Sequence, residues 1–252
     1  MSILKKRSFR VLLIVLAVLV ALVGACAIYL CDYYPADAQM MERFEMPEGV
    51  VREVLEDGSV AFVPEEPTTG FIFYPGGKVE HTAYEPLMQV LAARGILCVL
   101  IEMPFRLAVL DIDAADGVQE KFPQIEHWYI GGHSLGGSMA ASYLEEHQDC
   151  FEGLVLLGAY STADLSGSEL SVLSLYGSED GVMDREKHAA CLQNLPTELT
   201  EIVIEGGNHA NFGVYGVQDG DGIATRTHEG QIMMSGELIA EFVLGKRPDG
   251  SN

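Results

Sequence analysis

Hydrophobic residues occur along this chain in short blocks that alternate with longer blocks of mixed apolar and polar residues. Short apolar runs bounded by turn residues are typical of buried strands, and the longer blocks are typical of amphipathic helices. Strands that alternate with helices predict an α/β fold, in which helices cover both faces of a mostly parallel sheet. The expected strands are residues 70–74, 96–102, 127–131, 153–158, 170–177 and 200–205, and the expected helices are 82–94, 107–115, 135–147 and 228–244.

Two further strands precede this alternation and predict an antiparallel hairpin. Residues 50–55 and 59–63 are rich in valine, and Glu56-Asp57-Gly58 between them is a turn signal. From the hairpin onward, the chain is long enough for one domain with a sizeable core. We therefore expect one α/β domain at 47–252, a tether at 32–46 and a separate N-terminal segment at 1–31.

The N-terminal segment has a different pattern, because no polar residue interrupts its apolar run. Four basic residues, Lys5, Lys6, Arg7 and Arg10, precede an apolar run at 11–30. A helix of about 20 residues spans roughly 30 Å, which is the thickness of the hydrocarbon layer of a bilayer. We expect one transmembrane helix here. Since basic residues stay on the cytoplasmic side, the α/β domain is expected outside the cytoplasm.

Three fates of this segment are open: an uncleaved signal anchor, a cleaved signal peptide and a lipoprotein signal. Val23-Gly24-Ala25-Cys26 resembles a lipobox, in which Cys26 would carry the lipid. The apolar run continues past Cys26 to Leu30, and this favours an uncleaved anchor. The expected location is the cell membrane with a single pass and an extracytoplasmic domain, and lipid anchoring at Cys26 is the alternative.

Composition and charge narrow the classes of partner. The net charge of −22 repels polyanions, which excludes nucleic acid and leaves the N-terminal helix as the contact with a membrane. A disulfide between Cys150 and Cys191 is left open, as is the oligomeric state. Asp219-Gly220-Asp221-Gly222 resembles the start of a calcium loop, but the other ligands do not follow at the required spacing. We therefore expect neither a metal nor a cofactor.

Gly132-His133-Ser134-Leu135-Gly136 lies between an expected buried strand and an expected helix. A reversal this tight requires small residues around the serine, and it leaves the serine Oγ exposed beside the amides of the helix N-terminus. Such a geometry makes a nucleophile. Ser134 is therefore the candidate nucleophile, and the amide of Leu135 is a candidate donor to an oxyanion.

A serine hydroxyl needs a histidine to take its proton and an acid to orient that histidine. Asp180 lies in a turn after the strand at 170–177, and His209 follows the strand at 200–205. Both then lie with Ser134 at the C-terminal edge of the sheet, as candidate acid and candidate base. Alternative candidates for the acid are Asp164, Glu179 and Asp184.

The strand at 70–74 runs into Pro75-Gly76-Gly77-Lys78. A backbone amide with no side chain in its way can approach a substrate oxygen, so Gly77 or Lys78 is the candidate for a second oxyanion donor. The alternative is a glycine turn that only connects the strand to the next helix.

Four segments resemble the small bacterial α/β-hydrolases of the dienelactone-hydrolase-like type: YPGGKVE at 74–80, GGHSLGG at 131–137, YGSEDGV at 176–182 and GGNHANFG at 206–213. The resemblance covers about residues 50–245 and implies an α/β-hydrolase fold. It also implies a catalytic triad of Ser134, Asp180 and His209, with the amides of Leu135 and of the Gly77–Lys78 turn as the oxyanion hole. Dienelactone hydrolases use a cysteine nucleophile, whereas this chain has Ser134, so we expect a general serine esterase.

These features predict a membrane-anchored serine hydrolase that cleaves carboxylic esters of small acyl substrates through an acyl-enzyme. Short connections between the strands leave no room for a lid domain, which favours small substrates. The alternatives are an acyltransferase that uses the same residues, or an exported binding protein without catalysis on the same scaffold. The physiological substrate and the preferred acyl chain are left open.

Overall fold

The computed structural model describes residues 3–245, with side chains from residue 9 onward. It forms two compact units, one ending at Tyr33 and the other beginning at Tyr34. The first unit is a helix, α1 (Ile3–Cys31). Its apolar part from Phe9 to Cys31 has no buried residue, and its 23 residues would span roughly 34 Å. By length and composition α1 is a candidate transmembrane helix, and a signal sequence has the same properties.

The second unit is built around an eight-stranded sheet with the strand order β1-β2-β4-β3-β5-β6-β7-β8. β2 runs antiparallel to its neighbours β1 and β4, and all other neighbouring strands are parallel. The predicted hairpin and the predicted parallel sheet are therefore both present. The strands are β1 (Val51–Val54), β2 (Val60–Val63), β3 (Thr69–Tyr74), β4 (Ile96–Leu100), β5 (His127–His133), β6 (Gly153–Leu157), β7 (Ser171–Gly177) and β8 (Leu199–Ile204).

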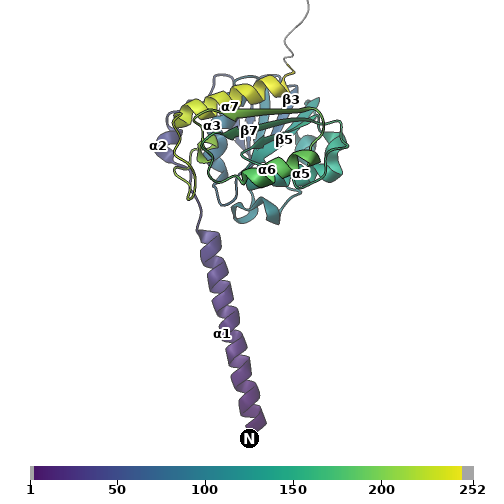
Figure 1. Cartoon of the computed structure of the whole chain (residues 1–252). Coiled ribbons are helices and arrows are strands. Elements are labelled where there is room, and N and C mark those ends of the chain that lie inside the picture. The colour runs from purple at the N-terminus through teal and green to yellow at the C-terminus, as the bar shows by residue number, and fades with distance from the viewer. Residues whose placement is uncertain (1–2, 246–252) are drawn as a thin grey trace, which may run out of the picture. The chain divides into compact units, whose positions relative to one another are not determined.

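Helices cover both faces of this sheet (Figure 1). α3 (Glu85–Ala92) and α7 (His228–Val243) pack together on one face, whereas α5 (Leu135–His147) and α6 (Arg185–Cys191) lie on the other. The predicted three-layer α/β arrangement is confirmed. The shorter elements are α2 (Ala38–Met41), α4 (Val118–Lys121) and the 3-10 turns η1 (His81–Tyr84), η2 (Pro104–Arg106), η3 (Ala108–Leu110), η4 (Gln148–Cys150), η5 (Leu192–Asn194) and η6 (Ala210–Phe212).

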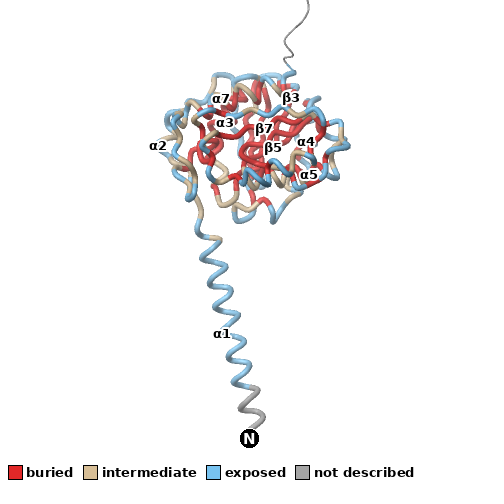
Figure 2. The backbone as a smooth tube through the Cα atoms, viewed as in Figure 1, coloured by how far each residue is buried: buried red, intermediate tan, exposed pale blue. Residues whose placement is uncertain are grey.

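Each face of the sheet has its own hydrophobic core, and the central strands are buried between the two cores (Figure 2). On β3, Phe71 and Phe73 belong to the core under α3 and α7, whereas Ile72 and Tyr74 belong to the core under α5. All four side chains are fully buried. Because both faces are covered, the central strands are apolar along most of their length. Their parallel pairing brings the C-terminal ends of the strands to one edge.

The segment predicted as a helix at 107–115 is different in the structure. It contains only the short turn η3 followed by further turns. The buried hydroxyl of Tyr74 donates a hydrogen bond to the carbonyl of Ile112 at 2.7 Å and accepts one from the amide of Ala115 at 2.9 Å. In a helix these backbone groups would pair with residues four positions away. A side chain from β3 therefore takes the place of helical hydrogen bonds.

Residues 34–46, most of the tether predicted at 32–46, belong to the second unit. The amide of Tyr34 donates to the carbonyl of Lys78 at 2.7 Å, and the carbonyl of Tyr34 accepts from the amide of Glu80 at 2.9 Å. Partly buried side chains that follow and pack on the core are Ala36, Met40, Met41 and Phe44. The folded unit therefore begins at Tyr34, before the predicted boundary at residue 47.

Candidate active site

Ser134 lies at the sharp turn between β5 and α5. Its backbone has φ 52° and ψ −121°, a conformation that residues with a side chain rarely adopt. The glycines on either side are sterically required: a Cβ on Gly132 would lie 2.5 Å, and one on Gly136 2.2 Å, from the carbonyl oxygen of Tyr74. The turn therefore passes against the end of β3, and Ser134 lines the cavity at the edge of the sheet.

Asp180 lies in the turn after β7, with its side chain fully buried. One carboxylate oxygen, Oδ1, accepts hydrogen bonds from the amides of Val182 at 2.9 Å and Met183 at 2.8 Å. The other, Oδ2, lies 2.8 Å from Nδ1 of His209. Burial alone would raise the pKa of Asp180, but the hydrogen bonds from His209 and from the two amides hold the pKa below its usual value. The carboxylate is therefore ionised at neutral pH.

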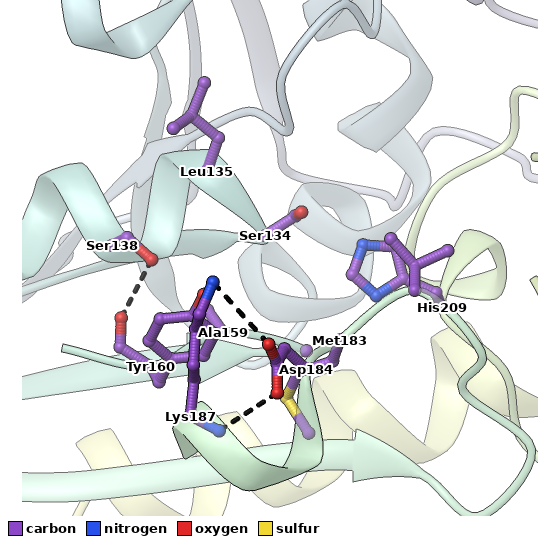
Figure 3. A pocket seen from close by; sticks show the side chains of 11 residues that line it. Ser134, Leu135, Ser138, Ala159, Tyr160, Met183, Asp184, Lys187 and His209 are labelled. Carbon is purple, nitrogen blue, oxygen red and sulfur yellow. Dashed lines mark hydrogen bonds and ion pairs between the residues drawn. The ribbon is translucent and has the colours of Figure 1, made fainter. Parts of the chain in front are cut away.

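His209 follows β8 and has a side chain that is 1% exposed. Because the ionised Asp180 can only accept, Nδ1 of His209 carries a hydrogen, and in a neutral imidazole Nε2 is then the acceptor. Nε2 is buried and has no hydrogen-bond partner among the residues that the structure describes. Figure 3 shows Ser134 and His209 at the same cavity, with the serine hydroxyl directed toward the imidazole.

Gly158, after β6, lies against this acid–base pair. Its φ is 51°, and a Cβ there would lie 2.9 Å from Nδ1 of His209 and 3.1 Å from Oδ2 of Asp180. A side chain at this position would therefore push against both partners of the hydrogen bond. Glycine at position 158 therefore leaves the room that the Asp180–His209 pair needs.

Two of the three candidate oxyanion donors have free amides. Within the described part of the chain, the amides of Gly77 and Leu135 donate no hydrogen bond. The two residues are neighbours, since a Cβ on Gly77 would lie 3.0 Å from Cδ2 of Leu135. The amide of Lys78 instead donates to the carbonyl of Arg106 at 2.8 Å. Of the alternatives Gly77 and Lys78, only Gly77 therefore has an amide available for a substrate oxygen.

His133, the residue before Ser134, packs against His209. The two ring centroids are 4.4 Å apart, and Nδ1 of His133 lies 2.8 Å from the hydroxyl of Tyr84. The same hydroxyl accepts the amide of Gly76 at 3.2 Å. Burial, with the nearby His209, holds the pKa of His133 well below its usual value. His133 is therefore a neutral ring between the candidate base and the turn that carries Gly77.

The cavity has a volume of about 380 Å³ and is lined mainly by the turns that follow β6 and β7. Its walls include Ala159, Tyr160, Val182, Met183 and Lys187, none of which the sequence analysis singled out. The sequence could have indicated the wall residues that directly follow predicted strands, because in an open α/β sheet ligands bind at the C-terminal ends of the strands. Ala159 and Tyr160 follow the end of β6, Val182 and Met183 follow the end of β7, and Lys187 lies in α6.

The other candidates from the sequence lie elsewhere or have other partners. Asp164 is exposed and accepts from Ser166, and Asp184 caps α6. Glu179 accepts from the hydroxyl of the preceding serine. Cys150 and Cys191 are free thiols. Within residues 3–245, no three histidine, cysteine or acidic side chains gather in a group that would hold a metal ion.

Residues 70–233 match the alpha/beta hydrolase family. No curated protein matches the chain. Similarity to solved structures extends over nearly the full length of each of them. Dienelactone hydrolase from Anabaena variabilis has a TM-score of 0.60 and 15% identity, covering 79% of this chain and 99% of that chain. Est1E from Butyrivibrio proteoclasticus has a TM-score of 0.54 and 15% identity, covering 79% of this chain and 98% of that chain. A protein described as a predicted CIB-like hydrolase from Thermoplasma acidophilum has a TM-score of 0.54 and 12% identity, covering 76% of this chain and 98% of that chain.

Proposed function

Because the chain belongs to the alpha/beta hydrolase family and is dienelactone-hydrolase-like, we propose that it is a serine hydrolase that cleaves carboxylic esters. Ser134 is the nucleophile, His209 the general base and Asp180 the acid that orients the imidazole. The observation that carries this proposal is the buried Asp180–His209 hydrogen bond of 2.8 Å, whose imidazole leaves Nε2 unpartnered at the cavity that Ser134 also lines. A buried nitrogen without a hydrogen-bond partner costs stability, and a role as proton acceptor would account for its position here.

In the first half of the reaction, Oγ of Ser134 attacks the ester carbonyl while Nε2 of His209 takes the hydroxyl proton. The carbonyl electrons move to oxygen and form a tetrahedral oxyanion. The imidazolium then gives its proton to the leaving alcohol, and the acyl group remains on Ser134. In the second half, water attacks the acyl-enzyme with the same proton transfers and releases the acid.

The amides of Gly77 and Leu135 stabilise the oxyanion in both halves. They come from different turns, one after β3 and one at the start of α5, and both are free to donate. Donors that are fixed before the reaction need no rearrangement as charge develops, and removing one such donor typically costs about 10²–10³-fold in rate.

A cavity of about 380 Å³ is near the small end of the range for ligand sites, which supports small acyl substrates. The adjacent wall is mixed in character, since apolar Met183 lies close to Lys187 and Asp184, which form an ion pair at 3.6 Å (Figure 3). We therefore place esters with a short acyl group and a partly polar alcohol ahead of long-chain lipids.

The N-terminal helix is proposed to anchor the enzyme in the cell membrane. The apolar part of α1 is long enough to cross a bilayer, and the basic residues that precede it favour a cytoplasmic N-terminus. The hydrolase unit would then act outside the cytoplasm. Mass spectrometry of the protein from membranes tests this, because an intact N-terminus supports an anchor, a missing α1 supports cleavage, and a lipid on Cys26 supports a lipoprotein.

A fluorophosphonate probe tests the proposed nucleophile, since it reacts with activated serines. Full-length protein should be labelled once and should hydrolyse short-chain nitrophenyl esters, and Ser134→Ala should lose both properties. Ser138→Ala is the matched control, because Ser138 lines the same cavity but donates its hydroxyl to the carbonyl of Tyr160 at 2.8 Å. The control should be labelled like the wild type. Labelling that persists in Ser134→Ala, or a folded wild type that is never labelled, contradicts the proposal.

A further inference from the structure

The loop that contains Asp219-Gly220-Asp221-Gly222 is not explained by the proposed chemistry. In the structure the carboxylate of Asp221 accepts hydrogen bonds from four backbone amides. Oδ1 accepts from Gly181 at 3.1 Å, His209 at 3.2 Å and Gly222 at 2.8 Å, and Oδ2 accepts from Ala210 at 2.8 Å. Both oxygens are therefore used within the protein, and hydrogen bonds to a charged acceptor are stronger than neutral ones.

Three of these four amides belong to the two turns that carry the candidate acid and base, and the fourth, that of Gly222, belongs to the loop itself. Gly181 directly follows Asp180 in the turn after β7, whereas His209 and Ala210 follow β8. One carboxylate thus joins two turns that are separated along the chain and whose side chains meet in the Asp180–His209 hydrogen bond. The loop adds a further link, because the side-chain amide of Asn208 donates to the carbonyl of Gly222 at 2.9 Å.

The loop also lies against the acid turn with no space between them. A Cβ on Gly181 would lie 2.6 Å from the carbonyl oxygen of Gly220, and one on Gly222 would lie 1.9 Å from that of Glu179. Such close contacts require glycine at positions 181 and 222. The position of Asp221 relative to Asp180 is therefore fixed by the backbones of both segments as well as by its own hydrogen bonds.

We propose that Asp221 is a positioning residue of the hydrolase site, which acts through Asp180 and His209 without touching the substrate. It does not line the cavity. By tying the two turns together it fixes the distance and angle between carboxylate and imidazole, to which catalytic rates are sensitive at the level of 1 Å. Its negative charge beside the backbone of His209 also favours the imidazolium that forms in the transition state. This inference rests on the proposed function.

The test compares Asp221→Ala and Asp221→Asn in the full-length protein. Removing the carboxylate should lower kcat about 100-fold while KM changes less than about twofold, because the cavity keeps its lining. Asparagine keeps the shape and one acceptor oxygen but loses the charge. Its NH₂ group would face the amide of Ala210, so that two donors would oppose each other. This variant should therefore recover part of the activity, to about tenfold below wild type.

Asp219→Asn is the matched control, since Asp219 lies two positions earlier in the same loop and its side chain makes no hydrogen bond in the described structure, only its amide donating to Tyr34 at 3.3 Å. It should keep wild-type kcat. An unchanged kcat in folded Asp221→Ala overturns the inference, as does a loss confined to KM. Should Asp221→Ala fail to fold, Asp221→Asn is used instead, provided that its melting temperature equals that of the wild type. An unchanged kcat in that variant, or a loss confined to KM, overturns the inference. Absence of fluorophosphonate labelling in the wild type overturns the proposed function itself and this inference with it.

Discussion

The acid–base side of the cavity and its nucleophile side are fixed by different means. On the acid–base side, Asp180 and Asp221 accept hydrogen bonds from backbone amides, and Asp180 also pairs with His209. On the nucleophile side, Ser134 is held by its own backbone conformation, and glycines leave room for the end of β3. The first side depends on charged side chains as well as on glycines such as Gly158, whereas the second depends on glycines and on backbone conformation.

This difference separates two kinds of damage. Changing a carboxylate on the acid–base side removes a charge from a buried site but leaves the packing of the sheet in place. Adding even one methyl group at Gly132 or Gly136 on the nucleophile side forces the backbone around Ser134 away from the end of β3. We therefore expect substitutions on the acid–base side to lower activity in a folded protein, and substitutions on the nucleophile side to lower stability as well.

The largest expected effect comes from Asp180→Asn. The amide keeps the shape of the side chain but can donate toward Nδ1 of His209, which stabilises the wrong tautomer of the imidazole. The kcat for ester hydrolysis should fall about 10⁴-fold, as for the equivalent change in other triads. Steady-state kinetics and a melting curve check this, with Asp164→Asn as a control on an exposed acid. A drop of less than tenfold in folded protein would count against Asp180 as the orienting acid.

The second prediction concerns Gly136 on the nucleophile side. In Gly136→Ala the new Cβ would meet the carbonyl oxygens of Tyr74 and Pro75 at 2.2 and 2.3 Å, so the backbone must shift. The free energy of unfolding should fall by about 3 kcal/mol. Gly77→Ala is the matched variant, because its Cβ would meet only the Leu135 side chain at 3.0 Å. Urea unfolding should show a loss below about 1 kcal/mol for Gly77→Ala, and equal losses would refute the comparison.

A third prediction uses the segment that joins both sides. Tyr34 hydrogen-bonds the Lys78 carbonyl next to Gly77, and its hydroxyl accepts the amide of Asp219 in the loop that carries Asp221. A protein that begins at residue 47 loses these contacts, and its free energy of unfolding should be lower by about 3 kcal/mol than that of a protein beginning at residue 32. Urea unfolding and ester hydrolysis of the two purified proteins check this. Identical midpoints and rates would show that the segment is dispensable.

The smallest expected effect is a dependence of stability on pH through His133. Its pKa in the folded state lies well below the value of about 6.5 for an unfolded histidine, so below this pH the unfolded chain binds a proton that the folded one does not. Stability is fully present above pH 6.5 and falls by about 1 kcal/mol by pH 5.5. His133→Gln, which still accepts from Tyr84, should show a shallower fall in thermal melts. A slope identical to wild type would contradict a neutral His133.

Sequence patterns predicted the sheet and the edge where Ser134, Asp180 and His209 lie, because both depend on local order along the chain. Buried strands are continuous apolar runs, and residues that directly follow parallel strands are brought to one edge by the sheet itself. The strongest of these signals was Ser134, since its turn needs glycines that are visible in the sequence.

Features that depend on contacts between distant segments were not predictable in this way. Two examples are the hydrogen bond between Tyr84 and His133 and the four hydrogen bonds of Asp221. They form only when separate segments of the chain fold against one another. The same holds for the amide of Lys78, which donates to the carbonyl of Arg106. It also holds for the hydroxyl of Tyr74, which hydrogen-bonds Ile112 and Ala115 where the sequence predicted a helix. Apolar and polar patterns report burial, but they do not report which partner a buried polar group will find.

The cavity wall built by the turns after β6 and β7 makes this site suitable for redesign of substrate range. Tyr160, Met183 and Lys187 face the cavity, and their side chains donate nothing to Asp180, His209 or Ser134. By contrast, His133, in the turn that carries Ser134, is a buried ring in contact with the candidate base. Libraries that vary the three wall positions and keep residues 132–136 fixed would change selectivity with the least damage to turnover.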